Sequence, residues 1–330
     1  MKLSTRKIQT RFEKSSLYDK TKTALMNVKV SSHKVPLWEV LRVFSNQITK
    51  DDINNKANAM AFSFMLAVFP GIIFLFTLIP YIPVNELDIK ILKFLADVMP
   101  TKVYLEAKST ITDIISKPRG GLLSFGFILA LLSAMNGSVA MMSAFNKCYK
   151  TVERRNFITV RLTALYITFV LVFILIFAIV AITIGEVVLH FYFDHLSFMG
   201  SFELYFFLIL RYIVVFVTFF LCLSFIYYVA PSLHKKFDYL SIGALIGTVL
   251  IILVSLGFSL YLNKFATFNK VYGSIGTLIA LMLWFYLISL TILIGFELNA
   301  SVDTVRILTE RNHKIIKKNA YRTKKKAADQ

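Results

Sequence analysis

Charged residues and cysteines are scarce in this chain, and each scarcity excludes a class of protein. Asp, Glu, Lys and Arg make up 17% of the 330 residues, whereas soluble globular domains contain about 25%. The two cysteines, Cys148 and Cys222, lie far apart, which predicts neither a disulfide framework nor a cysteine-based metal site. The first 30 residues contain no apolar stretch, so we expect no cleavable signal peptide.

Recognisable catalytic motifs are missing as well. The sequence contains no G-x-S-x-G, no H-E-x-x-H and no phosphate-binding loop. His190, Asp194 and His195 gather in "HFYFDH", which we expect to be an outer loop without the fixed geometry that metal ligation needs. We therefore predict a protein that is not an enzyme and that carries no cofactor and no metal.

Apolar residues dominate the chain. They make up 57% of it, and the mean hydropathy is +0.67. A helix of about 20 apolar residues is long enough to cross the hydrocarbon core of a bilayer. Six spans reach that length, at residues 57–82, 121–145, 162–189, 204–230, 239–262 and 273–296. The sequence thus predicts an all-α, polytopic membrane protein with six transmembrane helices.

Basic residues predict the orientation of these helices. If the loops alternate between the two sides, 28 Lys and Arg fall on one side and 8 on the other, with Arg211 inside a span. Because Lys and Arg concentrate in the cytoplasm, both termini are expected there. The basic tail at 314–326 then faces anionic lipid headgroups. Nucleic-acid binding is the weaker alternative, because no binding fold accompanies the charge.

Two regions outside the spans have amphipathic patterns. In "PLWEVLRVFSNQI", Leu37, Val40, Leu41, Phe44 and Ile48 share one helical face, which predicts an interfacial helix before the first span. The loop at 85–117 carries two such patterns separated by a proline, which predicts an outer helical hairpin. We expect three parts: a basic cytoplasmic segment at 1–35, the membrane domain at 36–305 and a basic tail at 306–330.

Polar and helix-breaking residues within the spans are the candidate binding or gating residues. Pro70 and Gly71 predict a kink in the first helix, either for packing or as a break lining a pathway. Asn136 sits in a small-residue stretch of the second helix, where packing and ligand contact are both open. Arg211 either extends to the outer headgroups or pairs with Glu186 of the preceding helix.

Glu297 and Asn299 follow 24 uncharged residues, at 273–296. A carboxylate at the C-terminal end of a helix is unfavourable for the helix dipole, so a partner is expected. The candidates at the same membrane level are Lys56, Asn58, Lys147 and Arg161. We predict that Glu297 and Asn299 bond to at least one of them, as a structural clasp or as a cytoplasmic gate.

Several segments resemble one known family. "NAMAFSFMLAVFPG", "AMNGSVAMMSAFNKCYK" and the stretch from "GFSLY" through "YGSIG" to "GFELNA" are similar, in this order, to the YihY/BrkB family. The resemblance spans residues 36–305. It implies a six-helix protein of the bacterial plasma (inner) membrane, in a family once labelled as a ribonuclease. It also implies a link to serum resistance or to export of envelope lipid, with no functional residues to carry over.

Two functions lead at this point, ahead of a membrane enzyme as the third hypothesis. The first is transport or flipping of an anionic lipid or another envelope amphiphile. The alternative is a non-catalytic scaffold that maintains the envelope. Membrane lipids, with anionic headgroups foremost, are the expected partners, and no specific nucleic acid is expected.

Overall fold

The computed structural model describes residues 16–30, 35–50, 52–82, 89–93, 101–116, 118–149, 151–195, 201–233, 236–264 and 274–328. At the edges of these ranges, including residues 182–195 and 201–208, the backbone is described without the side chains. The expected position Leu95 and the tip of the loop at 265–273 lie outside the described residues.

Long helices build nearly all of the described chain, as the sequence predicts. They are α2 (Ser16–Asn27), α3 (Leu37–Lys50), α4 (Ile53–Leu78), α6 (Thr101–Ser116), α7 (Gly120–Cys148), α8 (Phe157–His195), α9 (Ser201–Val229), α10 (Ile242–Lys264) and α12 (Ser274–Ala328). A short 3₁₀ turn, η1 (Ile79–Tyr81), closes α4. The described strands are β1 (Lys29–Val30) and β2 (Val35–Pro36), a two-residue antiparallel pair.

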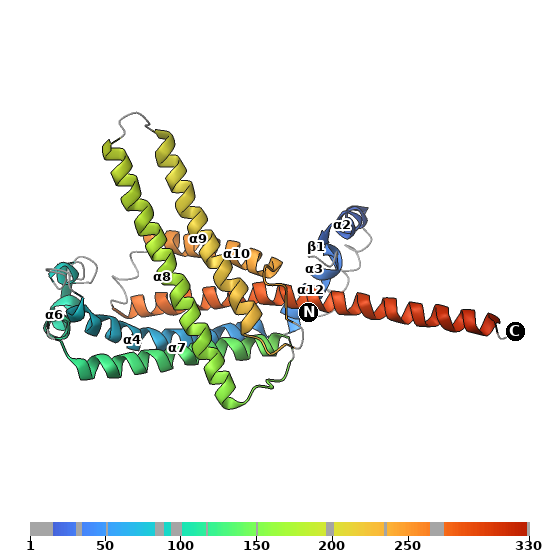
Figure 1. Cartoon of the computed structure of the whole chain (residues 1–330), viewed down its shortest axis with the longest axis horizontal. Helices are drawn as coiled ribbons and strands as arrows, with labels where there is room; N and C mark the ends of the chain where they lie inside the picture. Colours follow the sequence, from blue (N-terminus) through green and yellow to red (C-terminus); the bar gives the residue numbers. More distant parts are fainter. Residues whose placement is uncertain are drawn as a thin grey trace.

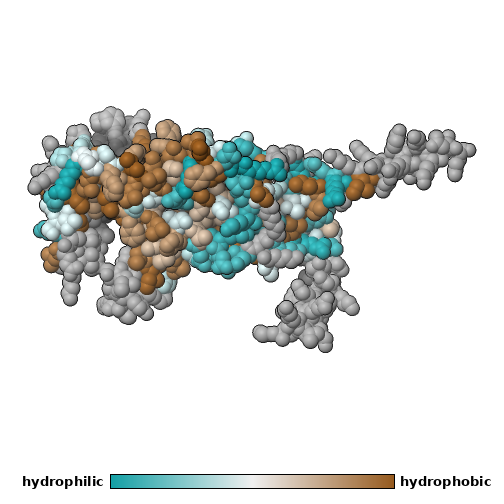
Figure 2. Space-filling view, turned by 90° about the horizontal axis from the view of Figure 1, so that it is seen from below, coloured by the Kyte–Doolittle hydropathy of each residue, from teal (hydrophilic) through white to brown (hydrophobic). Residues whose placement is uncertain are grey.

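Six of the described helices are long and apolar enough to cross a membrane, which confirms the expected number. These are α4, α7, α8, α9, α10 and the first half of α12. In Figure 1, α4, α7, α10 and α12 run along the long axis, and the α8–α9 pair crosses them obliquely. Figure 2 shows hydrophobic surface over one half of the molecule and hydrophilic surface toward the α12 extension, as expected for a bilayer-embedded bundle.

Aromatic side chains fill the core where the long helices meet. Phe145 of α7 stacks on Phe296 of α12 with ring centroids 4.2 Å apart. Tyr227 of α9 meets both rings edge-on and donates a hydrogen bond to the Ile292 carbonyl oxygen at 2.7 Å. The tyrosine hydroxyl therefore has a partner although its residue is only 1% exposed. This core lies beside the polar residues of the candidate site.

The helix α3 and the described parts of the expected hairpin, residues 89–93 and α6, are helical at the predicted positions, whereas the turn of the hairpin at 94–100 lies outside the described residues. Val40 of α3 packs against Leu298, Val302 and Val305 of α12, whereas Leu41, expected on the same face, is 39% exposed. Residues 89–93 are helical. Leu92, Ile111 and Ile115 pack against the end of α4, which confirms the expected contact between the hairpin and the bundle.

The structure excludes one of the alternatives left open for the helices and shows that two further expectations are wrong. The helix α4 continues through Pro70, so the first span is not broken there, and its kink stays a prediction. The segment from His190 to His195 belongs to α8 rather than to a loop. The last helix does not end near Glu297: α12 continues to Ala328, because a helix can outlast the apolar stretch that crosses the bilayer.

Candidate functional site

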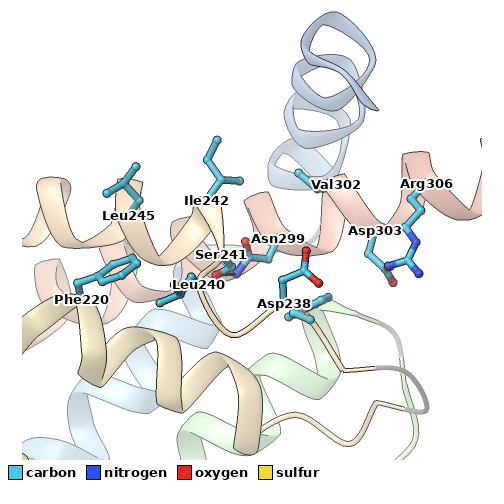
Figure 3. Close-up of a pocket in the computed structure, with 11 residues that line it drawn as sticks. Phe220, Asp238, Leu240, Ser241, Ile242, Leu245, Asn299, Val302, Asp303 and Arg306 are labelled. Atoms are coloured by element: carbon cyan, nitrogen blue, oxygen red, sulfur yellow. Dashed lines mark hydrogen bonds and ion pairs between the residues drawn. The ribbon is translucent and has the colours of Figure 1, made fainter. Parts of the chain in front are cut away.

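A cavity of about 650 Å³ lies at the end of the bundle where α9, α10 and α12 meet. Its lining comes from α9, the following loop, the start of α10 and the middle of α12 (Figure 3). The apolar part of the lining consists of Phe220, Phe237, Leu240, Ile242, Leu245 and Val302. The polar part consists of Asp238, Ser241, Asn299, Asp303 and Arg306. The cavity thus offers an apolar wall beside a charged one.

Asn299 joins the two helices that border this cavity. Its Oδ1 accepts a hydrogen bond from the Gly243 N–H at 2.8 Å, and its Nδ2 donates to Ser241 Oγ at 2.8 Å. Asn299 is only 4% exposed, so both bonds are shielded from water. The prediction that Asn299 bonds to Lys56, Asn58, Lys147 or Arg161 is wrong. The sequence missed its actual partners because the first turn of α10 looks like ordinary apolar span.

Asp303 is the centre of the charged wall. The Tyr149 hydroxyl, from the end of α7, donates a hydrogen bond to its carboxylate. Arg306 lies 3.8 Å from the other carboxylate oxygen and also reaches Glu310 at 3.1 Å. Burial and the bond to Asp303 raise the pKa of the Tyr149 hydroxyl well above its usual value. Tyr149 therefore stays a neutral donor at physiological pH.

Glu297 lies six residues before Asp303 on α12, in the interior of the protein. It is 1% exposed, and its carboxylate interacts with the Cys148 thiol of α7. The Lys56 ammonium of α4 lies 3.6 Å from the same sulfur. Lys56, one of the four expected partners, is therefore close to Glu297, and the two charged groups meet at a cysteine. Since a buried charge is costly without compensation, this cluster ties α4, α7 and α12 together.

A second polar network holds the loop between α7 and α8. Glu153 accepts hydrogen bonds from Arg155 at 2.7 and 2.8 Å and from Asn146 at 2.7 Å. Arg155 also donates to the Ala230 carbonyl oxygen at 2.9 Å, and Asn146 accepts from the Ser232 N–H at 2.8 Å. The bonds from Arg155 lower the pKa of Glu153 from its ordinary 4.5 to about 2. Sequence reasoning missed this network.

The remaining candidate residues do not gather at the cavity. Asn136 accepts a hydrogen bond from Arg161 at 2.5 Å, which joins α7 to α8. Ser138, two residues on, bonds Thr168 at 3.0 Å, which favours the packing interpretation of this stretch. Asn58 is exposed near the start of α4.

Pro70, Gly71 and Arg211 lie in the spans, away from the cavity lining. A Cβ atom added at Gly71 would meet nothing within 4 Å. Arg211 is an exposed residue of α9, and the side chain of Glu186 lies outside the described residues. Their pairing stays a prediction.

The comparisons with known proteins agree with this architecture. The family model described as "Virulence factor BrkB" matches residues 44–319. The chain is 32% identical to the "Putative ribonuclease-like protein YfkH" of Bacillus subtilis, over 82% of this chain and 98% of that protein. It is 34% identical to a "UPF0761 membrane protein" of Xanthomonas campestris, over 28% of this chain and 21% of that protein. No solved structure matches.

Proposed function

We propose, from the premise that the chain belongs to the virulence factor BrkB family of membrane proteins, that it transports or flips a lipid-like amphiphile. The proposed location is the bacterial plasma membrane, with both termini in the cytoplasm. The basic loops and tail support this orientation through their attraction to the cytoplasmic side. One observation carries the transport proposal, namely the cavity with an apolar and a charged wall between α9, α10 and α12.

The size and chemistry of this cavity suit an amphiphile. Its volume of about 650 Å³ lies within the range of roughly 300–1,000 Å³ typical of ligand sites. Phe220 and Leu245 offer apolar surface for an acyl chain. Arg306 offers the guanidinium that pairs with phosphate. An anionic headgroup therefore remains the proposed cargo.

The two aspartates narrow this proposal. Asp238 and Asp303 line the same wall as Arg306 (Figure 3), and Asp303 competes for the guanidinium at 3.8 Å. A bare anion would face two carboxylates. A headgroup with a phosphate for Arg306 and a hydroxyl or ammonium group for Asp238 suits both signs of charge.

A lipid-movement assay tests the proposal. The protein is reconstituted into liposomes that contain a fluorescent phosphatidylglycerol, and dithionite then quenches the label on the outer leaflet. Transport predicts that the wild type exposes inner-leaflet label faster than protein-free liposomes. Leu245→Trp should slow this movement because the indole fills the apolar wall. Leu253→Trp is the matched control, since Leu253 lies on the same helix, is 58% exposed and does not line the cavity. Equal rates with and without wild-type protein would reject the proposal.

A scaffold remains the second candidate, and the length of α12 favours it. The helix extends from the bundle to Ala328 as a basic rod (Figure 1), which suits the docking of an acidic partner. Copurification of one fixed partner, together with no lipid movement, would favour the scaffold.

We propose no nuclease activity, despite the ribonuclease-like name of the Bacillus subtilis relative. Within the described ranges no three His, Cys, Asp or Glu side chains gather as a metal site. Metal-dependent hydrolysis of RNA requires such a cluster. Release of nucleotides from RNA by the purified protein, beyond that by a mock purification, would contradict this.

A further inference from the structure

A second cavity, of about 330 Å³, lies between the start of α4 and the end of α7. We call it the α4–α7 groove, and its polar lining consists of Asp52, Asn55, Lys56, Ser63, Ser143 and Lys147. The remainder is formed by Ala59, Ala140 and Ala144, whose short side chains leave room between the two helices. It shares no lining residue with the cavity between α9, α10 and α12.

Two lysines dominate the charge of this groove. Lys56 is half-buried and held in place by the Cys148 sulfur at 3.6 Å, next to the buried Glu297. A cation fixed by its neighbours loses little freedom when a ligand arrives. Lys147 is exposed and makes no ion pair within the described part of the chain. It is therefore available to an anion from solution.

The start of α4 adds to this positive charge. Asp52 occupies the position before the helix with φ of 39°, and its side chain makes no capping hydrogen bond to α4. The first turn thus lacks the usual side-chain acceptor, although its Asn55 N–H donates to the Asp52 carbonyl oxygen at 3.2 Å. N–H groups at the start of a helix attract anions. The Asp52 carboxylate opposes an anion, but it already accepts a bond from Asn55 Nδ2 at 2.5 Å. Glu297, behind Lys56 and outside the lining, offsets part of the Lys56 charge. The exposed Lys147, the remaining charge of Lys56 and the helix end act together against the Asp52 carboxylate.

We propose that the α4–α7 groove binds a phosphate group through Lys56 and Lys147. Phosphate suits it because the anion is compact and accepts several hydrogen bonds from ammonium and hydroxyl donors. Ser143, an exposed residue of the lining four positions before Lys147 on α7, is the neutral donor. The phosphate belongs either to a lipid headgroup or to a soluble phosphate compound, since both present the same oxygens. The α4–α7 groove is separate from the cavity proposed for transport. A negative result in the lipid-movement assay would therefore not contradict phosphate binding in the groove.

The test measures binding of two probes to the full-length protein purified in detergent. The probes are inorganic phosphate, at matched ionic strength, and a short-chain phosphatidic acid, each titrated by calorimetry. Saturable binding of at least one probe is expected. Lys147→Gln should weaken it by roughly tenfold, the usual effect of losing one charge-assisted contact. Lys147 is the residue of choice because Lys56 also contacts Cys148, so that Lys56→Gln can disturb folding.

The matched control is Lys29→Gln, which removes an exposed lysine of β1 outside the groove and should change affinity by less than about twofold. Competition between the two probes supports a site for phosphate from either source. Binding of phosphatidic acid alone supports a lipid-headgroup site. Failure of both probes to bind the wild type, or equal affinity of wild type and Lys147→Gln, would overturn the proposal.

Discussion

Asn299 illustrates how one side chain can hold two membrane helices together. Replacing it with alanine removes the bonds to the Gly243 N–H and to Ser241 Oγ, both buried beside α12. An unsatisfied buried partner costs about 1–3 kcal/mol. We expect Asn299→Ala to lower the free energy of unfolding by that amount, measured by denaturant titration in detergent. Asn58→Ala, at an exposed position, should stay within about 0.5 kcal/mol of the wild type. Equal losses in the two variants would contradict the role of Asn299.

Glu153 makes the stability of the loop between α7 and α8 depend on pH. Its pKa in the folded protein, about 2, lies below the ordinary 4.5 because Arg155 binds the carboxylate. The stabilisation is therefore present above about pH 4.5 and is lost as the pH falls toward 2. We expect the melting temperature of Glu153→Gln to lie below that of the wild type at pH 6. The difference should shrink as the pH is lowered through this window.

The control for Glu153 is Asp113, which pairs with Arg119 at 2.6 Å in an exposed position. Exposed pairs contribute little to stability, so Asp113→Asn should leave the melting temperature nearly unchanged at each pH. A pH-independent difference between Glu153→Gln and the wild type would show that the carboxylate acts by packing alone.

At the scale of elements, the crossing of α10 and α12 depends on two glycines. A Cβ atom added at Gly295 would lie 2.5 Å from the Tyr227 hydroxyl and 2.7 Å from the Gly243 carbonyl oxygen. One added at Gly243 would lie 2.5 Å from Asn299 Oδ1. The two backbones can approach this closely only because neither residue has a side chain. The same contact allows Asn299 to reach the start of α10.

We expect Gly243→Ala to destabilise the protein by about 1–3 kcal/mol, since the added methyl group must push the helices apart. The measurement is the denaturant midpoint in detergent. Gly257→Ala, on the same helix with nothing within 4 Å of the added Cβ atom, should be neutral or slightly stabilising because alanine favours a helix. A stable Gly243→Ala protein beside an unstable Gly257→Ala protein would contradict this account of the crossing.

For the whole molecule, the orientation in the membrane is the main prediction. Single cysteines at Asp194, Arg154 and Lys325 are introduced into a variant in which Cys148 and Cys222 are replaced by alanine. A membrane-impermeant maleimide added to intact cells should label the first position and spare the other two, because the proposed topology places the basic loops in the cytoplasm. Labelling after lysis is the control, and it should reach all three. The reverse pattern in intact cells would invert the topology.

The sequence by itself determined the number of spans and the kind of environment each helix occupies. A bilayer requires about 20 apolar residues per crossing. These residues can be counted along the sequence without knowledge of any tertiary contact. The apolar face of the hairpin at Ile111 and Ile115 followed from its helical period in the same way. The family followed from "GFSLY", "YGSIG" and "GFELNA" in their order.

Only the tertiary structure decided which helices face one another and which polar groups meet. A transmembrane helix such as α8 is apolar on every side, so its pattern does not distinguish the lipid-facing from the buried face. Tyr149 and Asp303, 154 residues apart, come together only after α7 packs beside α12. The sequence analysis placed Glu297 at a helix end because the hydropathy shows only where the apolar span ends. The backbone hydrogen bonds of α12 continue beyond that point, so the helix extends to Ala328.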